Sequence, residues 1–203
     1  MNTILKIDGD HPDLTVIRKA VHCLKEGGLI IIPTETVYGI ACDPNHIEAL
    51  NRIRVVKGRD EKKPIARLVA SVKQAKEIAI NWNQGIEALC NQFWPGPLTL
   101  VLQTKEGWTG FRVPDHPIPL AIADIFGSSI ALTSANLSGK NDARTATETN
   151  HLSVDLVLDS GSTGKDTTPS SVVKIDHNNF EGLREGSLTF KELESVFKRG
   201  INS

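Results

Sequence analysis

The sequence predicts a mixed α/β domain. Short apolar segments with the character of strands alternate along the whole chain with segments whose apolar residues follow the 3.6-residue period of helices. The helical segments begin after polar capping residues and end at glycine or proline. The run Leu29–Ile32 is apolar throughout, as expected of a strand that is covered on both faces.

The expected strands are short apolar runs bounded by turn residues. In chain order they cover Thr3–Ile7, Leu29–Ile32, Ile65–Ala70, Leu98–Gln103, Gly110–Val113, Ser129–Thr133, Asp155–Leu158, Ser171–Ile175 and Glu181–Arg184. The expected helices alternate with them. They run from His11-Pro12 to Gly27-Gly28, over His46–Val56, from the cap Ser71, from the cap Asn83 to Pro95-Gly96-Pro97, near Ile118–Phe126, and from Thr189 to Gly200.

Two of these helices carry a sequence signature at their first turn. Ser71 is followed three residues later by Gln74, and Thr189 by Glu192, which is the spacing of a capping box. The chain has no repeat, low-complexity tract or Pro/Gly linker that would divide its 203 residues, so we expect a single domain over residues 1–203.

Composition narrows the function classes. The net charge of −1 predicts no polyanion partner, so any nucleotide or RNA site must come from local clusters of charge. Cys23, Cys42 and Cys90 form no Cys-x-x-Cys pair and have apolar neighbours, which predicts free thiols in a reducing cytoplasm. The N-terminus lacks a signal-peptide pattern, and the longest apolar run is too short to span a membrane. The histidines show no metal-ligand spacing, so no metal site is expected.

Familiar nucleotide motifs are absent as well. The sequence has no Gly-x-x-x-x-Gly-Lys-[Ser/Thr] loop and no Gly-x-Gly-x-x-Gly after a strand. The polar segments at the ends of predicted strands therefore carry the functional argument, since binding and catalytic residues concentrate on such loops.

Two of these segments lie in the first third of the chain. Pro33–Gly39 offers two hydroxyls, a carboxylate and a phenol, either for a ligand or for a turn that satisfies its own backbone. The segment Arg52–Arg67 holds seven basic residues against two acidic ones. Lys57 and Arg59 flank a glycine there, a spacing that lets both cations reach one anion such as a triphosphate. The alternative is a solvated basic face.

The other segments come later. Thr133–Gly139 brings small hydroxyl and amide groups that suit phosphate oxygens or a sugar, and it could equally be a polar turn. Thr168–Ser171 and Leu183–Gly186 add hydroxyls and one more arginine at strand ends.

Taken together, these segments identify a resemblance. PTETVYG, KGR, WPGPLTL, FRVPDHP, TSANLSG, PSSVV and LREG occur in this order, and the chain thereby resembles the YrdC/TsaC family of threonylcarbamoyl-AMP synthases along nearly its whole length. The resemblance implies a twisted, mostly mixed β-sheet flanked by helices, with a concave basic surface. It also implies the short form of the family, without an additional C-terminal domain.

The resemblance also implies site residues. The family's ATP-handling tetrad falls on Lys57, Arg59, Ser134 and Asn136, with Lys57 and Arg59 as the catalytic cations. Arg184 matches an arginine near the nucleotide. The expected threonine contacts are Thr36, Arg112, which would meet the carboxylate, and Ser170.

The implied reaction joins L-threonine, bicarbonate and ATP. The amine and bicarbonate give a carbamate, which attacks the α-phosphorus of ATP and releases pyrophosphate, with Mg²⁺ accompanying the ATP. The product, threonylcarbamoyl-AMP, would pass to a tRNA threonylcarbamoyl transferase complex for tRNA modification, and a direct tRNA contact is an open expectation. Such an enzyme is a cytoplasmic nucleotidyltransferase.

One departure from the family pattern concerns the amino-acid side. Family members commonly read Pro-Leu-x-x-His after the Lys-Gly-Arg segment, whereas this chain reads Pro64-Ile65-Ala66-Arg67-Leu68. An alternative is therefore a divergent paralogue, or a non-catalytic protein that binds RNA or nucleotide through the same basic surface. Trp82, Trp94 and Trp108 lie near enough in sequence to suggest an RNA surface, although Trp94 in WPGPLTL is expected in the core.

Overall fold

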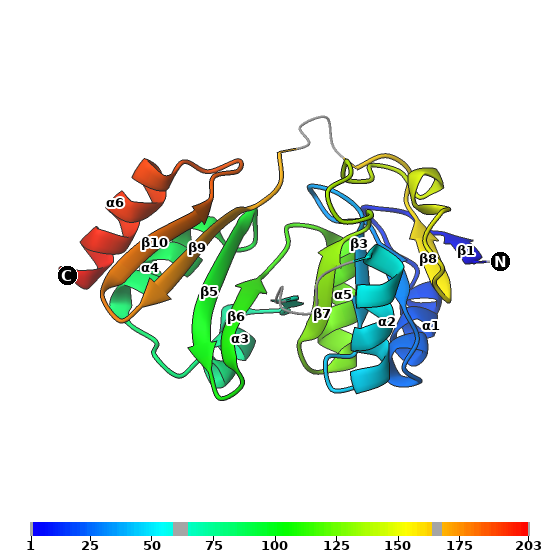
Figure 1. The fold of residues 1–203 in the computed structure, drawn as a ribbon, viewed down its shortest axis with the longest axis horizontal. Coiled ribbons are helices and arrows are strands. Elements are labelled where there is room, and N and C mark those ends of the chain that lie inside the picture. Colours follow the sequence, from blue (N-terminus) through cyan, green and yellow to red (C-terminus); the bar gives the residue numbers. More distant parts are fainter. Residues whose placement is uncertain (1, 59–64, 164–167, 203) are drawn as a thin grey trace.

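A computed structural model describes residues 2–58, 65–163 and 168–202. Within these residues ten strands form one mixed sheet in the order β1-β8-β2-β3-β7-β4-β6-β5-β9-β10 (Figure 1). The sheet contains both parallel pairs, such as β1 with β8 and β5 with β9, and antiparallel pairs, such as β2 with β3 and β5 with β6. The mixed α/β class and the helix-flanked mixed sheet are thus confirmed.

The strands are short, as their apolar runs predict. They are β1 Thr3–Lys6, β2 Ile30–Ile32, β3 Gly39–Cys42, β4 Ala66–Leu68, β5 Leu98–Thr104, β6 Gly107–Arg112, β7 Ile130–Ser134, β8 Leu156–Asp159, β9 Ser171–Asp176 and β10 Asn179–Arg184. The helices are α1 Leu14–Lys25, α2 Ile47–Lys57, α3 Val72–Ile78, α4 Gln84–Phe93, α5 Pro117–Phe126 and α6 Phe190–Ile201, with a 3₁₀ turn at Thr147–Thr149.

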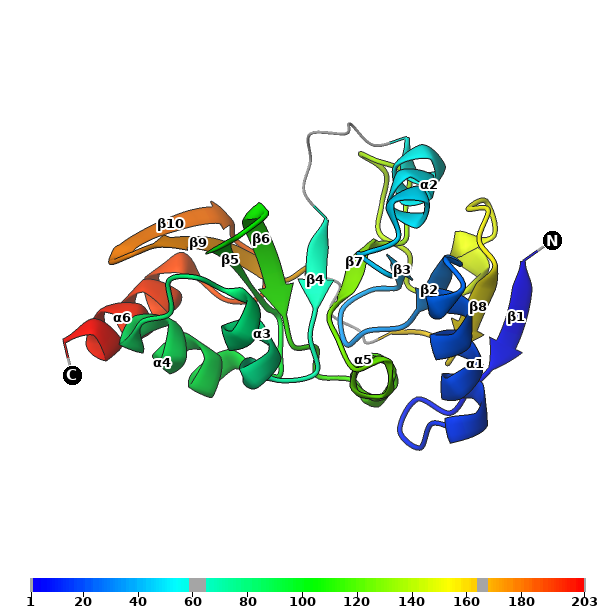
Figure 2. The same ribbon diagram turned by 90° about the horizontal axis from the view of Figure 1, so that it is seen from below.

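The helices cover the sheet unequally. Figure 2 shows α3, α4 and α6 below β5, β6, β9 and β10, and α1 and α5 on that same side of the other half of the sheet. Helix α2 lies on the opposite side, so β5, β6, β9 and β10 have no helix of the described chain on their second face (Figure 2). The short strand β4 lies between the two halves, where it pairs with β7 and β6.

Three apolar clusters fill the spaces between sheet and helices. One packs α4 and α6 on the sheet around Leu98, Phe111 and Phe197. A second joins α1 and α5 to the sheet and includes Leu68, and a third packs α2 against β2 and β3. Because helices cover β5, β6, β9 and β10 on one face only, the other face of these strands can hold polar groups without disturbing the core.

The capping residues act largely as predicted. Ser71, Asn83 and Thr189 each accept an N–H bond from the residue three positions later. The Ser71 box differs in one detail, since Gln74 Oε1 accepts from Ala70 N rather than from Ser71. Helix α1 begins at Leu14 with Asp13 as its cap, two residues later than His11-Pro12 suggest.

Strand β3 is the main element that the sequence did not predict. Its four residues are all buried, and it begins with a glycine, a residue depleted in strands. A Cβ at Gly39 would lie 2.7 Å from Leu132 Cδ1 and 3.3 Å from the carbonyl oxygen of Thr133, so a larger residue would have to displace the Leu132 side chain. In the described residues, no helix combines the length and apolarity needed to cross a membrane.

Candidate functional site

A cavity of about 370 Å³ lies where the open side of β5, β6 and β9 meets the loops of the other half of the sheet. Its described lining includes five of the residues singled out from the sequence, namely Thr36, Arg112, Ser134, Ser170 and Arg184. They come from segments far apart in the chain, and the fold brings all five to one place.

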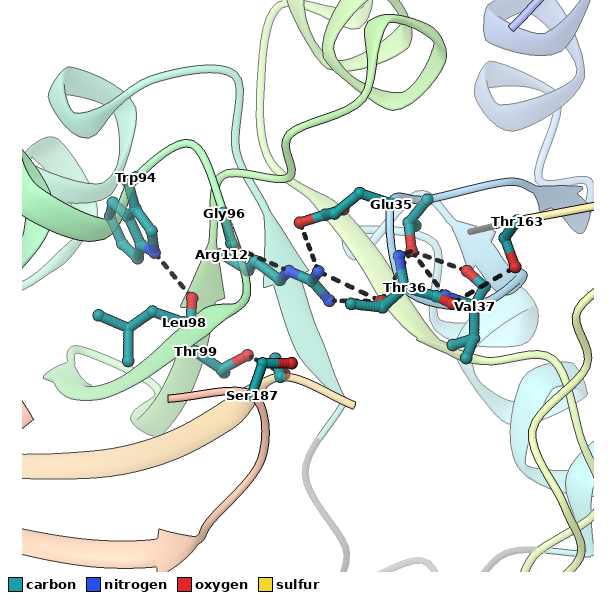
Figure 3. A network of polar contacts seen from close by, with 12 residues as sticks. Glu35, Thr36, Val37, Trp94, Gly96, Leu98, Thr99, Arg112, Thr163 and Ser187 are labelled. Carbon is teal, nitrogen blue, oxygen red and sulfur yellow. Dashed lines mark hydrogen bonds and ion pairs between the residues drawn. The ribbon is translucent and has the colours of Figure 1, made fainter. Parts of the chain in front are cut away.

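Arg112, the last residue of β6, is held in a fixed orientation (Figure 3). Its Nε donates to the carbonyl oxygen of Gly96 at 3.2 Å, and Nη1 and Nη2 donate to Thr36 Oγ1 at 3.3 and 3.2 Å. Nη2 also forms an ion pair with Glu35 Oε1 at 2.6 Å. The guanidinium is therefore positioned before any ligand arrives, as recognition of a carboxylate requires.

The turn that presents Thr36 is stabilised by Thr34. Thr34 Oγ1 donates to the carbonyl of Val37 at 2.7 Å, so its single proton is used. In the 3.0 Å contact between the two hydroxyls, Thr36 must then be the donor. This arrangement directs the lone pairs of Thr36 Oγ1 toward Arg112. The segment thus combines both alternatives from the sequence, with Thr34 satisfying the backbone and Thr36 facing the cavity.

Tyr38 of the same segment serves the structure. Its hydroxyl donates to the carbonyl of Gly161 at 2.7 Å and accepts from Ser160 N at 3.2 Å. Burial raises the pKa of this phenol, so it stays protonated. Thr163 Oγ1 donates to the carbonyl of Thr36 at 3.3 Å, which ties the segment after β8 to the same turn (Figure 3).

Lys57, Ser134 and Asn136 form a second group. Lys57 is buried at 3% exposure, and its Nζ donates to the carbonyl of Ser134, to the carbonyl of Asn136 at 2.7 Å and to Asn136 Oδ1 at 3.0 Å. Ser134 Oγ donates to the same Oδ1 at 2.7 Å. Lys57 therefore fixes the loop after β7. The fourth member of the expected tetrad, Arg59, lies outside the described residues.

Ser170 and Arg184 form a third group. Arg184 Nε and Nη2 donate to the carbonyl of Ser170 at 3.1 and 2.8 Å, and Ser170 Oγ lies 2.9 Å from Thr99 Oγ1. Desolvation lowers the pKa of Arg184, while Asp142 opposes that shift. A side chain at Gly186 would overlap the carbonyl of Pro169, so the segments 168–171 and 183–186 pack as one unit.

Several residues that line the cavity were not assigned to the site from the sequence. Thr99 and Asp142 line the cavity, and both lie in or beside motifs that the sequence analysis quoted, WPGPLTL and TSANLSG. Arg67 and Leu68 line it too. Arg67 pairs with Glu106 at 2.7 Å. Leu68 is 1% exposed and belongs to the apolar cluster between the sheet and the helices α1 and α5.

The lining favours an anionic ligand. Three of the described lining residues are arginines, Arg67, Arg112 and Arg184, and one is acidic, Asp142. Arg67 and Arg112 are already paired with Glu106 and Glu35, so Arg184 is the lining arginine that forms no ion pair within the described residues. Within the described chain no group of three or more His, Cys, Asp and Glu residues could hold a metal ion.

Trp94 is confirmed as a core residue, with its Nε1 donating to the carbonyl of Leu98 at 2.7 Å (Figure 3).

Comparison with known proteins finds curated relatives that cover most of this chain. The curated threonylcarbamoyl-AMP synthase of Pyrococcus abyssi is 33% identical over 193 residues, which cover 89% of this chain and 56% of that protein. The synthase of Aliivibrio fischeri is 34% identical over 84% of this chain and 98% of its own length. This chain spans little more than half the length of the P. abyssi relative.

A solved structure of a relative resembles this chain as well. The structure of P. abyssi Sua5 complexed with L-threonine is 31% identical to this chain, with a TM-score of 0.89 over 96% of this chain and 61% of that one. A model of the Sua5/YciO/YrdC family, described as telomere recombination, matches residues 22–186, a range that contains every residue proposed for the site. The chain belongs to the Sua5/YciO/YrdC family.

Proposed function

We propose that this protein is a threonylcarbamoyl-AMP synthase, which converts L-threonine, bicarbonate and ATP into threonylcarbamoyl-AMP and pyrophosphate. The observation that carries the proposal is the cavity in which Arg112, Thr36 and Ser170 lie together with Ser134 and Arg184. Relatives named for this activity and a relative solved with L-threonine support it.

The amino-acid half of the site is assigned to Arg112, Thr36 and Ser170. The Arg112 guanidinium is fixed by Gly96, Glu35 and Thr36. Each Nη carries two hydrogens, so Nη1 keeps one beyond its bond to Thr36, and that hydrogen can meet the carboxylate of threonine. The hydroxyl group of Ser170 is suited to a remaining polar group of the amino acid. The hydroxyl of Thr36 donates to Thr34 and accepts from both Nη atoms, so it serves by orienting Arg112.

The nucleotide half is assigned to the loop after β7 and to Arg184. Lys57 holds Ser134 and Asn136 in place, and Ser134 lines the cavity. Arg184 lines it from β10. Arg59 completes the expected tetrad, and its assignment rests on the sequence resemblance alone.

The chemistry needs positioning and electrostatic stabilisation rather than a covalent nucleophile. The neutral amine of threonine takes up the carbon of bicarbonate with loss of water, and the resulting carbamate oxygen forms a bond to the α-phosphorus as the bond to pyrophosphate breaks. Negative charge moves onto the leaving pyrophosphate, so cations fixed beside it gain interaction in the transition state. Proximity of the two reactants supplies the rest.

We assign Mg²⁺ to the ATP rather than to a site built from protein side chains. Bound to phosphate oxygens, it would neutralise charge on the leaving group. Asp142 is the acidic residue among the described lining residues, so it would be the candidate for a carboxylate contact to the ion.

The same proposal includes the wider role. The enzyme would be a cytoplasmic nucleotidyltransferase whose product is used by a tRNA threonylcarbamoyl transferase complex, and tRNA itself is an optional contact. The free thiols of Cys23, Cys42 and Cys90 suit a reducing compartment.

The test is to incubate the pure protein with ATP and Mg²⁺ and to follow pyrophosphate with bicarbonate and threonine added or omitted. We expect release that requires both, without tRNA, and an adenylate product that contains labelled threonine. Release that ignores threonine and bicarbonate, from a protein that binds ATP, would contradict the proposal. Screening the other amino acids in parallel identifies a divergent paralogue.

A further inference from the structure

We propose that Glu35 is a positioning residue for the amino-acid substrate and that it acts through Arg112. The inference rests on the proposed function and adds a residue that neither the sequence resemblance nor the tetrad assigns. Glu35 is not among the described residues that line the cavity. Its carboxylate contacts the guanidinium of Arg112, which does line the cavity (Figure 3).

The pair is short and shielded from water. Nη2 of Arg112 lies 2.6 Å from Glu35 Oε1, with side-chain exposures of 12% and 18%. Charge-assisted hydrogen bonds of this length are the strong ones, and they are screened less where water is excluded. Glu35 therefore constrains the arginine more than an exposed surface carboxylate would.

Two further acceptors restrict the orientation of the Arg112 guanidinium, but neither provides the charged contact that Glu35 does. The carbonyl of Gly96 fixes Nε, and Thr36 Oγ1 is shared between Nη1 and Nη2 at 3.3 and 3.2 Å. These contacts are longer than the bond to Glu35, and both acceptors are neutral. Glu35 is the charged one of the three, and it sets which edge of the guanidinium remains for a substrate carboxylate.

The burial of Glu35 means that its charge must be balanced by Arg112. Glu35 Oε2 is buried and has no hydrogen-bond partner among the described residues. His116 lies close enough for its charge to interact with Glu35, but burial lowers the pKa of His116 and its Nδ1 accepts from Ile118 N. Arg112 is thus the cation that balances Glu35, and its removal would leave a buried carboxylate without compensation.

The test compares Glu35→Ala and Glu35→Gln with Glu106→Ala as a matched control. Glu106 forms the same kind of ion pair, at 2.7 Å, with Arg67, another arginine of the cavity, but its side chain is 72% exposed. Michaelis constants for threonine and ATP are measured by pyrophosphate release, and unfolding temperatures by circular dichroism.

If Glu35 positions Arg112, Glu35→Ala raises the KM for threonine by about 10- to 100-fold and changes the KM for ATP by less than about twofold. Glu35→Gln recovers most of the loss because its amide oxygen still accepts the hydrogen bond, and Glu106→Ala behaves as wild type. A lower KM for threonine in both Glu35 variants would overturn the proposal, since the carboxylate would then compete with the substrate. Equal rises in both KM values would also overturn it.

A melting cycle tests the pair without any substrate. The double variant Glu35→Ala/Arg112→Ala should unfold at a higher temperature than Arg112→Ala alone, because it removes the uncompensated carboxylate. If the decreases in unfolding temperature of the two single variants simply add in the double variant, Glu35 and Arg112 are not coupled and the proposal is contradicted. If the wild-type protein releases no threonine-dependent pyrophosphate, the proposed function fails, and this cycle still decides whether Glu35 and Arg112 act as a unit.

Discussion

Replacing Lys57 by methionine separates its structural role from the chemistry expected of it. The side chain is buried, and its Nζ holds the carbonyls of Ser134 and Asn136 and the side-chain oxygen of Asn136. Methionine has a similar length and no donors. The loop after β7 would therefore lose its anchor to α2, although Ser138 N would still donate to the carbonyl of residue 57 at 2.9 Å.

The magnitude follows from the acceptors left behind. Asn136 Oδ1 keeps its bond from Ser134 Oγ, and the carbonyl of Ser134 keeps its bond from Asn136 N, so the carbonyl of Asn136 is the acceptor that loses its donor. A buried acceptor without a partner costs about 1–3 kcal/mol, and we expect a loss of stability of this size. For a chain of this length, that corresponds to about 2–12 °C in Tm.

Differential scanning calorimetry and ATP titration measure the two effects. Lys57→Met should lower Tm by the stated amount and weaken ATP binding, while threonine binding persists because Arg112, Thr36 and Ser170 do not contact Lys57. Lys76→Met, at an exposed lysine paired with Glu87, is the control and should shift Tm by about 1 °C or less. An unchanged Tm in Lys57→Met would refute the anchoring role.

Three further predictions concern single positions. Arg59→Ala should lower kcat/KM by about 10²–10³ with an unchanged Tm, since a guanidinium facing a triphosphate contributes to the transition state; an active variant would assign the basic run to a solvated face. Leu68→His should destabilise the fold by about 1–3 kcal/mol in urea unfolding, because a polar group would enter an apolar cluster; a stable variant with a lower KM for threonine would instead place position 68 in the substrate site. Burial raises the pKa of Cys42 to about 12 and also raises that of Cys90, so neither thiol should react with a disulfide reagent at pH 8 until the protein is unfolded; rapid labelling of either in the native protein would contradict this.

The sequence predicted those parts of the fold that depend on local chemistry. Ser71, Asn83 and Thr189 lie at the starts of α3, α4 and α6 because a side-chain oxygen three residues before an N–H group is a local device. The buried run that contains β2 was equally clear. Strand β3 was missed because its burial comes from pairing with β2 and β7, which no local pattern records.

The site likewise has features that local sequence predicts and features that depend on contacts between distant segments. Thr36, Arg112, Ser134, Ser170 and Arg184 could be named because the order of the motifs identifies a family, and the structure brings these five to one cavity. The contacts that orient these residues could not be predicted, even where both partners, such as Lys57 and Asn136, had been named. Glu35 lies 77 residues from Arg112 and Lys57 lies 79 from Asn136, so each contact depends on how distant strands pair.

The close approaches of backbone explain why several motif residues carry no chemistry of their own. In WPGPLTL, a side chain at Gly96 would lie 2.6 Å from the carbonyl of Phe93, and the carbonyl of Gly96 is the acceptor that fixes Arg112 Nε. In LREG, Gly186 lets its segment pack on the backbone beside Ser170. Both glycines act on the site through another residue's orientation. A reaction that depends on holding two substrates in place requires such supports as much as the contacts themselves, because an error of about 1 Å in position can cost about a hundredfold in rate.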